Sequence, residues 1–114
     1  MSVKVNTRQV GDVTVIDVSG RITIGEGSSL IRESMRDLVA KGNKKILLNL
    51  GEVSYMDSTG IGELVAGFTS VANAGGTVKL LGVAKRVKDV LLITKLYTVF
   101  EVHEDEAHAV RSFA

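Results

Sequence analysis

The stretch "DSTGIG", residues 57–62, gathers an acid, two hydroxyls and two glycines, and no other stretch of the chain is as rich in polar chemistry. It follows a segment with the pattern of a buried strand and precedes one with the pattern of an amphipathic helix, so it is predicted to lie at a helix N-terminus. Backbone N–H groups there have no partner within the helix, and the helix dipole favours negative charge. Asp57 or Ser58 would supply the N-cap oxygen, and an added phosphate would find a favourable position.

Gly60 and Gly62 are unusual in the first turn of a helix, where each is less favourable than alanine by about 1 kcal/mol. Two absent side chains would let a phosphate group or the backbone of a partner approach closely. An ordinary cap, with glycines tolerated in a fraying first turn, explains the same residues without a partner. Both interpretations stay open on the residues alone.

A serine nucleophile is the first enzymatic interpretation, because Ser58 follows a strand-like segment and precedes a helix-like one. The strand-to-helix elbow of serine hydrolases has glycine two residues before the nucleophile, and Met56 stands at that position. His103 and His108 come later, in or beside a polar terminal helix, and are interpreted as solvated surface residues. A small serine hydrolase is therefore a disfavoured alternative, and a protein without enzymatic activity is expected.

No metal site and no cofactor are predicted. His103 and His108 are five residues apart, which matches neither of the helical spacings that would pair them as ligands. Gly25 and Gly27 precede a helix-like segment, but Leu30 stands where the third glycine of a dinucleotide fingerprint would fall. The chain has no cysteine, which removes disulfides and thiolate zinc sites from consideration.

The segments around the polar stretch alternate between strand and helix patterns. Residues 3–18 hold two β-rich runs around a Gly-Asp pair, which is typical of a hairpin. Residues 28–41 carry apolar side chains at helical spacing, and residues 44–50, "KKILLNL", have the pattern of a buried strand followed by a turn through Gly51. The helix that follows the polar stretch is predicted to end at "NAGG".

The C-terminal half is predicted to contain a strand at 77–83, a helix at about 84–92, a strand near 99–102 and a last helix at about 104–113. The inward-facing residues of these two helices are predicted to be Val87, Val90 and Leu91, and Ala107, Val110 and Phe113. The order β-β-α-β-α-β-α-β-α predicts a single α/β domain over residues 1–114. Its mixed sheet would have a parallel core and one antiparallel strand from the N-terminal hairpin.

Composition and charge narrow the class of protein. The chain has 114 residues, 45% of them apolar, which is enough for one core. Fourteen Lys and Arg against thirteen Asp and Glu leave a formal charge of +1, so no direct nucleic-acid partner and no anionic membrane partner are expected. No apolar run approaches the roughly 20 residues of a membrane span, and the N-terminus lacks the apolar core of a signal peptide. We expect a cytoplasmic protein.

The sequence "VSYMDSTGIGEL" resembles the Asp-Ser-Ser/Thr-Gly-Ile/Leu-Gly signature of bacterial anti-sigma factor antagonists in the STAS domain family. The likeness extends along the chain, because "VIDVSGRI", "GGTVKLLGVAKRVKDVL" and "VFEV" follow the family's order of elements at similar spacing. The resemblance implies a STAS domain with helices mainly on one face of the sheet. It also implies that Ser58 is a phosphoacceptor for an anti-sigma factor that is itself a serine kinase.

In that family the unphosphorylated protein binds the kinase and releases a sigma factor, which regulates transcription by partner switching in stress responses. The phosphorylated protein dissociates until a serine phosphatase resets it. The resemblance therefore implies a phosphoprotein and places partner-binding residues at one end of the domain. They are Thr23, Met56, Asp57, Ser58, Thr59, Gly60 and Gly62.

Two positions depart from the family pattern. Gly-Glu-Leu-Asp is common after the second strand, and here the sequence is "GRIT", which ends at Thr23. Asn49 stands where an aspartate is common. An alternative within the same fold is a STAS scaffold subunit of a large stress-sensing complex, which the size of the assembled particle would distinguish from a small one-to-one complex.

Overall fold

A five-stranded sheet organises the computed structural model, which describes residues 3–23, 28–83, 87–89, 91 and 100–113. The strands lie in sequence order and are β1 (Lys4–Val10), β2 (Val13–Ile22), β3 (Lys45–Met56), β4 (Thr77–Leu81) and β5 (Val102–His103). β1 is antiparallel to β2, and every other neighbouring pair is parallel. The predicted mixed sheet and its N-terminal hairpin are confirmed.

The hairpin turns at Gly11, whose φ of 62° lies in the region that glycine adopts without strain. β1 is mostly exposed, whereas the first half of β2 is buried almost continuously. This difference arises because β1 is an edge strand, while β2 lies between β1 and β3 and carries core residues on both faces.

The third strand is longer than its sequence pattern predicts. β3 continues six residues past Leu50, through Gly51, and ends at Met56. The prediction of a turn at Gly51 is wrong, because the second half of β3 stays paired with β2, with Ile22 opposite Met56. Gly51 serves a close approach of two backbones instead: a Cβ atom there would lie 3.1 Å from the carbonyl oxygen of Gly82.

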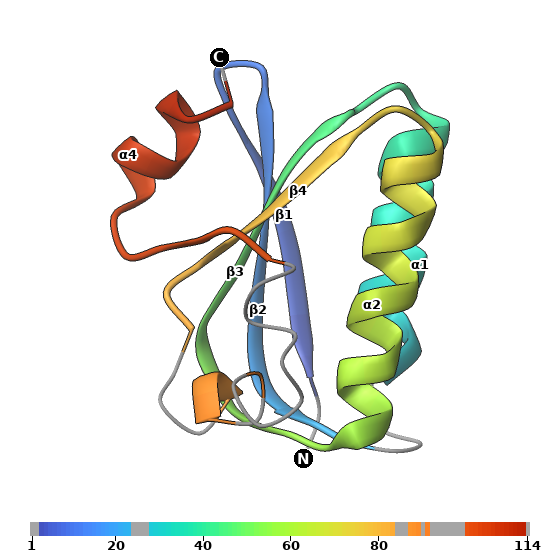
Figure 1. The fold of residues 1–114 in the computed structure, drawn as a ribbon, viewed down its shortest axis with the longest axis vertical. Helices are drawn as coiled ribbons and strands as arrows, with labels where there is room; N and C mark the ends of the chain where they lie inside the picture. The colour runs from blue at the N-terminus through green and yellow to red at the C-terminus, as the bar shows by residue number, and fades with distance from the viewer. Residues whose placement is uncertain (1–2, 24–27, 84–86, 90, 92–99, 114) are drawn as a thin grey trace.

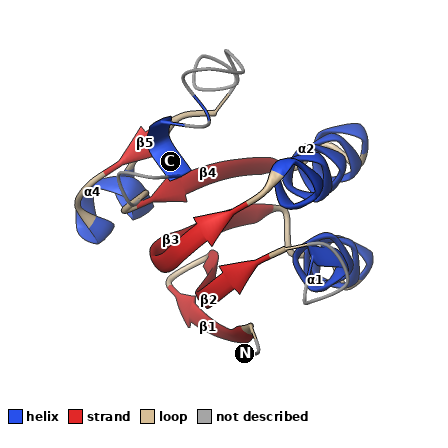
Figure 2. Cartoon of the chain, turned by 90° about the horizontal axis from the view of Figure 1, so that it is seen from below, coloured by secondary structure: helices blue, strands red, loops and turns tan. Residues whose placement is uncertain are grey.

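The helices cover both faces of the sheet unequally. α1 (Ser28–Ala40) and α2 (Ser58–Asn73) pack side by side on one face, and the short α4 (Glu106–Arg111) lies on the other (Figures 1 and 2). The main core lies between the sheet and the two long helices. It includes Ile16, Met35, Leu48, Leu64 and Leu80 among its buried side chains.

The C-terminal predictions are confirmed in part. Val87 and Leu91 are buried and helical, while Val90 lies outside the described residues. In α4 the inward-facing alanine is Ala109, which is fully buried, and the prediction of Ala107 is wrong because Ala107 is exposed. None of the helices in the described part of the chain is both long and apolar enough to cross a membrane.

A polar network ties the hairpin to the rest of the fold. Arg8 of β1 contacts Asp17 of β2 at 2.6 Å and Glu106 of α4 at 2.5 Å. The Arg8 guanidinium holds the pKa of Asp17 below its usual range, and a hydrogen bond from the Asn49 side-chain amide, 2.8 Å long, acts in the same direction. The Asn49 oxygen in turn accepts a hydrogen bond from the Gly51 N–H at 3.1 Å. Asparagine therefore suits position 49, because it donates to a carboxylate and accepts from the backbone.

We expect Asn49→Asp to lower the free energy of unfolding by about 1 to 3 kcal/mol at neutral pH. Two carboxylates would face each other where an amide now donates to Asp17, and one of them would take up a proton at a raised pKa. The loss in the free energy of unfolding is therefore largest at a pH above this raised pKa, where both carboxylates are charged. The loss vanishes as the pH falls below about 4, where the added carboxyl group is protonated in the folded and the unfolded protein alike.

Denaturant titrations of the parent and of Asn49→Asp between pH 4 and pH 7 test this expectation. Over this interval the added carboxyl group should change from its protonated to its charged form. Asn49→Ala, which removes the donor without adding charge, is the matched control and should show a deficit that does not shrink on acidification. An Asn49→Asp deficit that is equally independent of pH would contradict the charge argument.

Candidate functional site

The junction between β3 and α2 is the site that the polar stretch builds. Met56 ends β3 opposite Ile22, and the Asp57 N–H donates to the Ile22 carbonyl at 3.1 Å, so the end of the sheet holds the start of the helix. Asp57 is the N-cap of α2: its carboxylate accepts from the Gly60 N–H at 2.9 Å. The choice left open between Asp57 and Ser58 is therefore resolved in favour of Asp57.

Ser58 is the first residue of α2, and its side chain is exposed. Its hydroxyl forms no hydrogen bond with any residue that the structure describes, because the capping role is filled by its neighbour. Thr59 follows in a half-buried position. The hydroxyl at the helix start that is open to an approaching group is thus that of Ser58.

Met56 and Gly60 face the interior, and this corrects their assignment to a partner-binding surface. Met56 is 1% exposed and belongs to the main core. Gly60 is buried, and a Cβ atom there would lie 2.7 Å from Met56 Cγ and 2.9 Å from Ile22 Cγ2. The glycine is therefore needed for the packing of the helix start on the ends of β2 and β3, not for a bare outer surface.

Gly62 has the opposite environment. It is exposed, and a Cβ atom there would meet no atom within 4 Å. It lies four residues after Ser58, so the two positions share one face of the helix. In the described chain, neither packing nor backbone conformation requires glycine at position 62. Packing does require glycine at position 60. Of the two glycines, Gly62 keeps the surface beside the Ser58 hydroxyl open.

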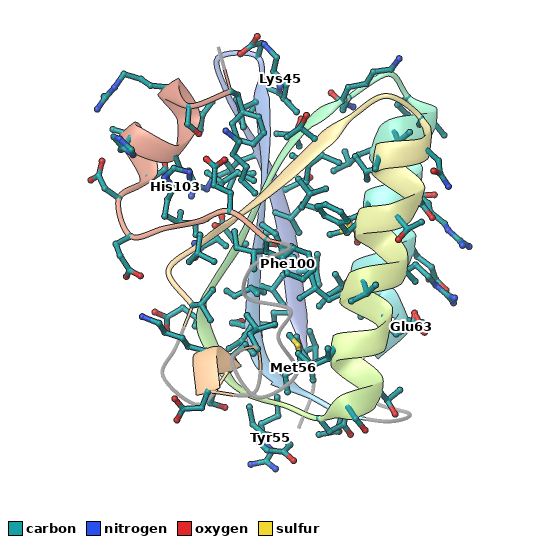
Figure 3. The ribbon with its side chains drawn as sticks, viewed as in Figure 1. Lys45, Tyr55, Met56, Glu63, Phe100 and His103 are labelled. Atoms are coloured by element: carbon teal, nitrogen blue, oxygen red, sulfur yellow. The ribbon has the colours of Figure 1, made fainter. Side chains whose placement is uncertain are left out.

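The end of β2 borders the same junction. Thr23 is half-buried and is the last described residue before the segment 24–27. Arg21 lies opposite Tyr55 in the pairing of β2 with β3, and its guanidinium carbon is 4.8 Å from the centre of the tyrosine ring. Figure 3 shows Tyr55 and Met56 at the same end of the molecule as the start of α2. The stacked Arg21 and Tyr55 were not predicted as part of the site, because only the extension of β3 brings them together.

The two histidines do not serve Ser58. His103 of β5 lies beside Leu81 of β4, which pairs with Asn49 of β3, and the strand from Asn49 to Met56 spans about 20 Å. His103 instead contacts Glu101, His108 and Ser112. A serine nucleophile needs its base within hydrogen-bond reach, and both histidines of the chain lie elsewhere. The geometry does not support the serine hydrolase alternative.

The fold and the junction define a small α/β domain that presents a hydroxyl at a capped helix start. The family model of the STAS domain matches residues 4–109. The anti-sigma-B factor antagonist of Bacillus subtilis is 29% identical over 102 residues, which cover 90% of this chain and 92% of that protein. The chain belongs to the STAS domain family.

Two solved structures illustrate the likeness. TM1081 of Thermotoga maritima, a candidate anti-sigma factor antagonist, matches with a TM-score of 0.85 and 25% identity over 95% of this chain and 92% of that one. The Bacillus cell fate determinant SpoIIAA in its phosphorylated form matches with a TM-score of 0.72 and 20% identity over 96% of this chain and 99% of that one. At that identity the second likeness concerns the fold alone.

Proposed function

We propose that this chain is a cytoplasmic anti-sigma factor antagonist controlled by phosphorylation of Ser58. In its unphosphorylated form it binds an anti-sigma factor that is also a serine kinase, and the bound kinase releases its sigma factor. Transfer of the γ-phosphoryl group of ATP to the Ser58 oxygen ends this binding, and a serine phosphatase restores it. The names of its relatives support the antagonist role.

The observation that carries the proposal is that the helix cap and the exposed hydroxyl at the start of α2 belong to different residues. Asp57 fills the capping position, which leaves the Ser58 hydroxyl exposed and without a partner among the described residues. A serine that capped the helix would have to break that hydrogen bond to be phosphorylated. Phosphorylation of Ser58 would therefore break no capping hydrogen bond.

The proposed docking surface consists of Thr23, Asp57, Ser58, Thr59 and Gly62. Met56 and Gly60 support this surface from inside and do not belong to it, because both are buried. A phosphate on Ser58 would lie at the positive end of the α2 dipole and beside the Asp57 carboxylate, two effects of opposite sign. The modification should therefore change what the surface presents to a partner and leave the fold intact.

We expect phosphate on Ser58, and not on Thr59 or Ser54, when the protein is incubated with its partner kinase and ATP. Ser58 is exposed at the helix start, whereas Thr59 is half-buried and Ser54 lies within β3. Mass spectrometry of the digested product locates the phosphate, and Ser58→Ala, the matched control, should take up none. Phosphate mapped to another residue would overturn the assignment.

The same kinase preparation distinguishes a small one-to-one complex with the kinase from the large complex of a scaffold subunit. Sedimentation of the unphosphorylated complex should give a small particle that dissociates on addition of ATP. A large particle that persists after phosphorylation would favour the scaffold alternative.

A further inference from the structure

The only two histidines of the chain are in contact where β5 meets α4, the helix on the opposite face of the sheet from α1 and α2 (Figure 2). His103 comes from β5 and His108 from α4, and their Nδ1 atoms lie 3.2 Å apart. The five-residue separation argued against a metal pair on one helix, but the two residues belong to different elements, so helical spacing does not apply. Figure 3 shows His103 far from the end of the molecule that carries Tyr55 and Met56.

The surroundings of His103 fix which nitrogen faces His108. The His103 side chain is 10% exposed, and its Nε2 lies 2.5 Å from a carboxylate oxygen of Glu101. Lys79 holds the same carboxylate at 3.0 Å. The Glu101 carboxylate therefore lies on the Nε2 side of the His103 ring, and Nδ1 is the nitrogen that faces His108.

We propose that His103 and His108 bind one divalent transition-metal ion of the Zn²⁺ class through their Nδ1 atoms. Two imidazole nitrogens on a tetrahedral Zn²⁺, each about 2.0–2.1 Å from the ion, stand about 3.3 Å apart, close to the separation found here. A histidine ligand commonly donates its other N–H to a carboxylate, which orients the ring and raises its basicity. Glu101 stands in that relation to His103.

The remaining chemistry of the site favours an exchangeable ion. His108 is exposed, which gives the ion an entry path from solvent. Binding through both Nδ1 atoms displaces the proton of the hydrogen bond between them, and Nε2 of the exposed His108 is a position that can take it up. Within the described part of the chain no group of three or more His, Cys, Asp or Glu is placed to hold a metal, so the two imidazoles would be the protein ligands of the proposed ion and water would take the remaining positions. The bound ion would join β5 to α4.

Zn²⁺ titration of the metal-free protein by calorimetry, near neutral pH in a buffer that does not bind metal, tests the proposal. We expect one ion per chain, and an affinity at least tenfold lower in both His103→Gln and His108→Gln. Glu101→Gln keeps both ligands and should weaken binding by about 10- to 100-fold, because the orienting carboxylate is lost. Glu33→Gln, which removes an exposed acid from α1, is the matched control and should bind as the parent does.

An unchanged affinity in His108→Gln would overturn the site, and so would parent-like affinity in His103→Gln, which would mean that exposed His108 binds alone. Because the His103 side chain is largely buried, His103→Gln could fail to fold. A second measurement therefore uses the parent protein and needs no variant. In ¹⁵N spectra of the parent protein, Zn²⁺ should shift the Nδ1 resonances of both imidazoles. A shift confined to one ring, or none, would leave a hydrogen-bonded histidine pair and refute the proposal.

Discussion

Ser58→Asp is expected to bind the partner kinase at least about a hundredfold more weakly than Ser58→Ala. Ser58 lies on the exposed start of α2, so a charge there would face a partner that binds the proposed docking surface. A partner that docks on an uncharged hydroxyl must desolvate the added carboxylate or face it with like charge, and such contacts can cost several kcal/mol. A hundredfold change corresponds to about 2.8 kcal/mol.

Both Ser58 variants should remain folded, which separates a docking effect from a folding effect. Asp57 supplies the N-cap, so neither change removes the capping hydrogen bond. Asp57→Ala is the informative comparison, because it should lower the free energy of unfolding by about 1 kcal/mol. Thermal melts and partner titrations of all three variants decide the matter. Equal affinities of Ser58→Asp and Ser58→Ala, with both proteins folded, would refute the electrostatic switch.

Gly60→Ala and Gly62→Ala are expected to change stability in opposite directions, although the two positions lie in the same turn. At position 60 a methyl group would lie within 3 Å of the side chains of Met56 and Ile22 and 3.1 Å from the Ile22 carbonyl oxygen. The resulting overpacking should lower the free energy of unfolding by about 1 to 3 kcal/mol. At position 62 the methyl group meets open space. The gain in helix propensity should therefore raise the free energy of unfolding by up to about 1 kcal/mol.

Denaturant unfolding of the two alanine variants beside the parent measures both changes, and each serves as the control for the other. Two changes of the same sign would show that the helix start does not pack as the structure has it. A third variant, Gly62→Gln, should be at least as stable as the parent, because glutamine has the higher helix propensity, and should weaken partner binding, because its side chain occupies the surface beside Ser58. Parent-like binding by Gly62→Gln would remove Gly62 from the docking surface.

Much of the fold follows from local pattern. The hairpin, α1 and the end of α2 at its glycines are confirmed, since each depends on residues close together in sequence. The parallel order of β2, β3 and β4 is confirmed as well, because strands that alternate with helices are joined by crossovers. The end of β3 was misplaced because Gly51 has the local pattern of a turn. Its role is set by Gly82, which is 31 residues away and lies directly after the end of the neighbouring strand β4.

At the candidate site, the sequence by itself determined where the chemistry lies: an acid, hydroxyls and glycines between a strand and a helix, with Ser58 among them. Only the tertiary structure decided what each residue does there. Asp57 caps because the end of β2 holds its backbone, Gly60 is small because Met56 and Ile22 fill the space above it, and Gly62 faces solvent. Two glycines that look equivalent along the chain differ because helical periodicity turns one toward the core and the other away from it. Likewise, His103 and His108 become neighbours only when a strand and a helix meet.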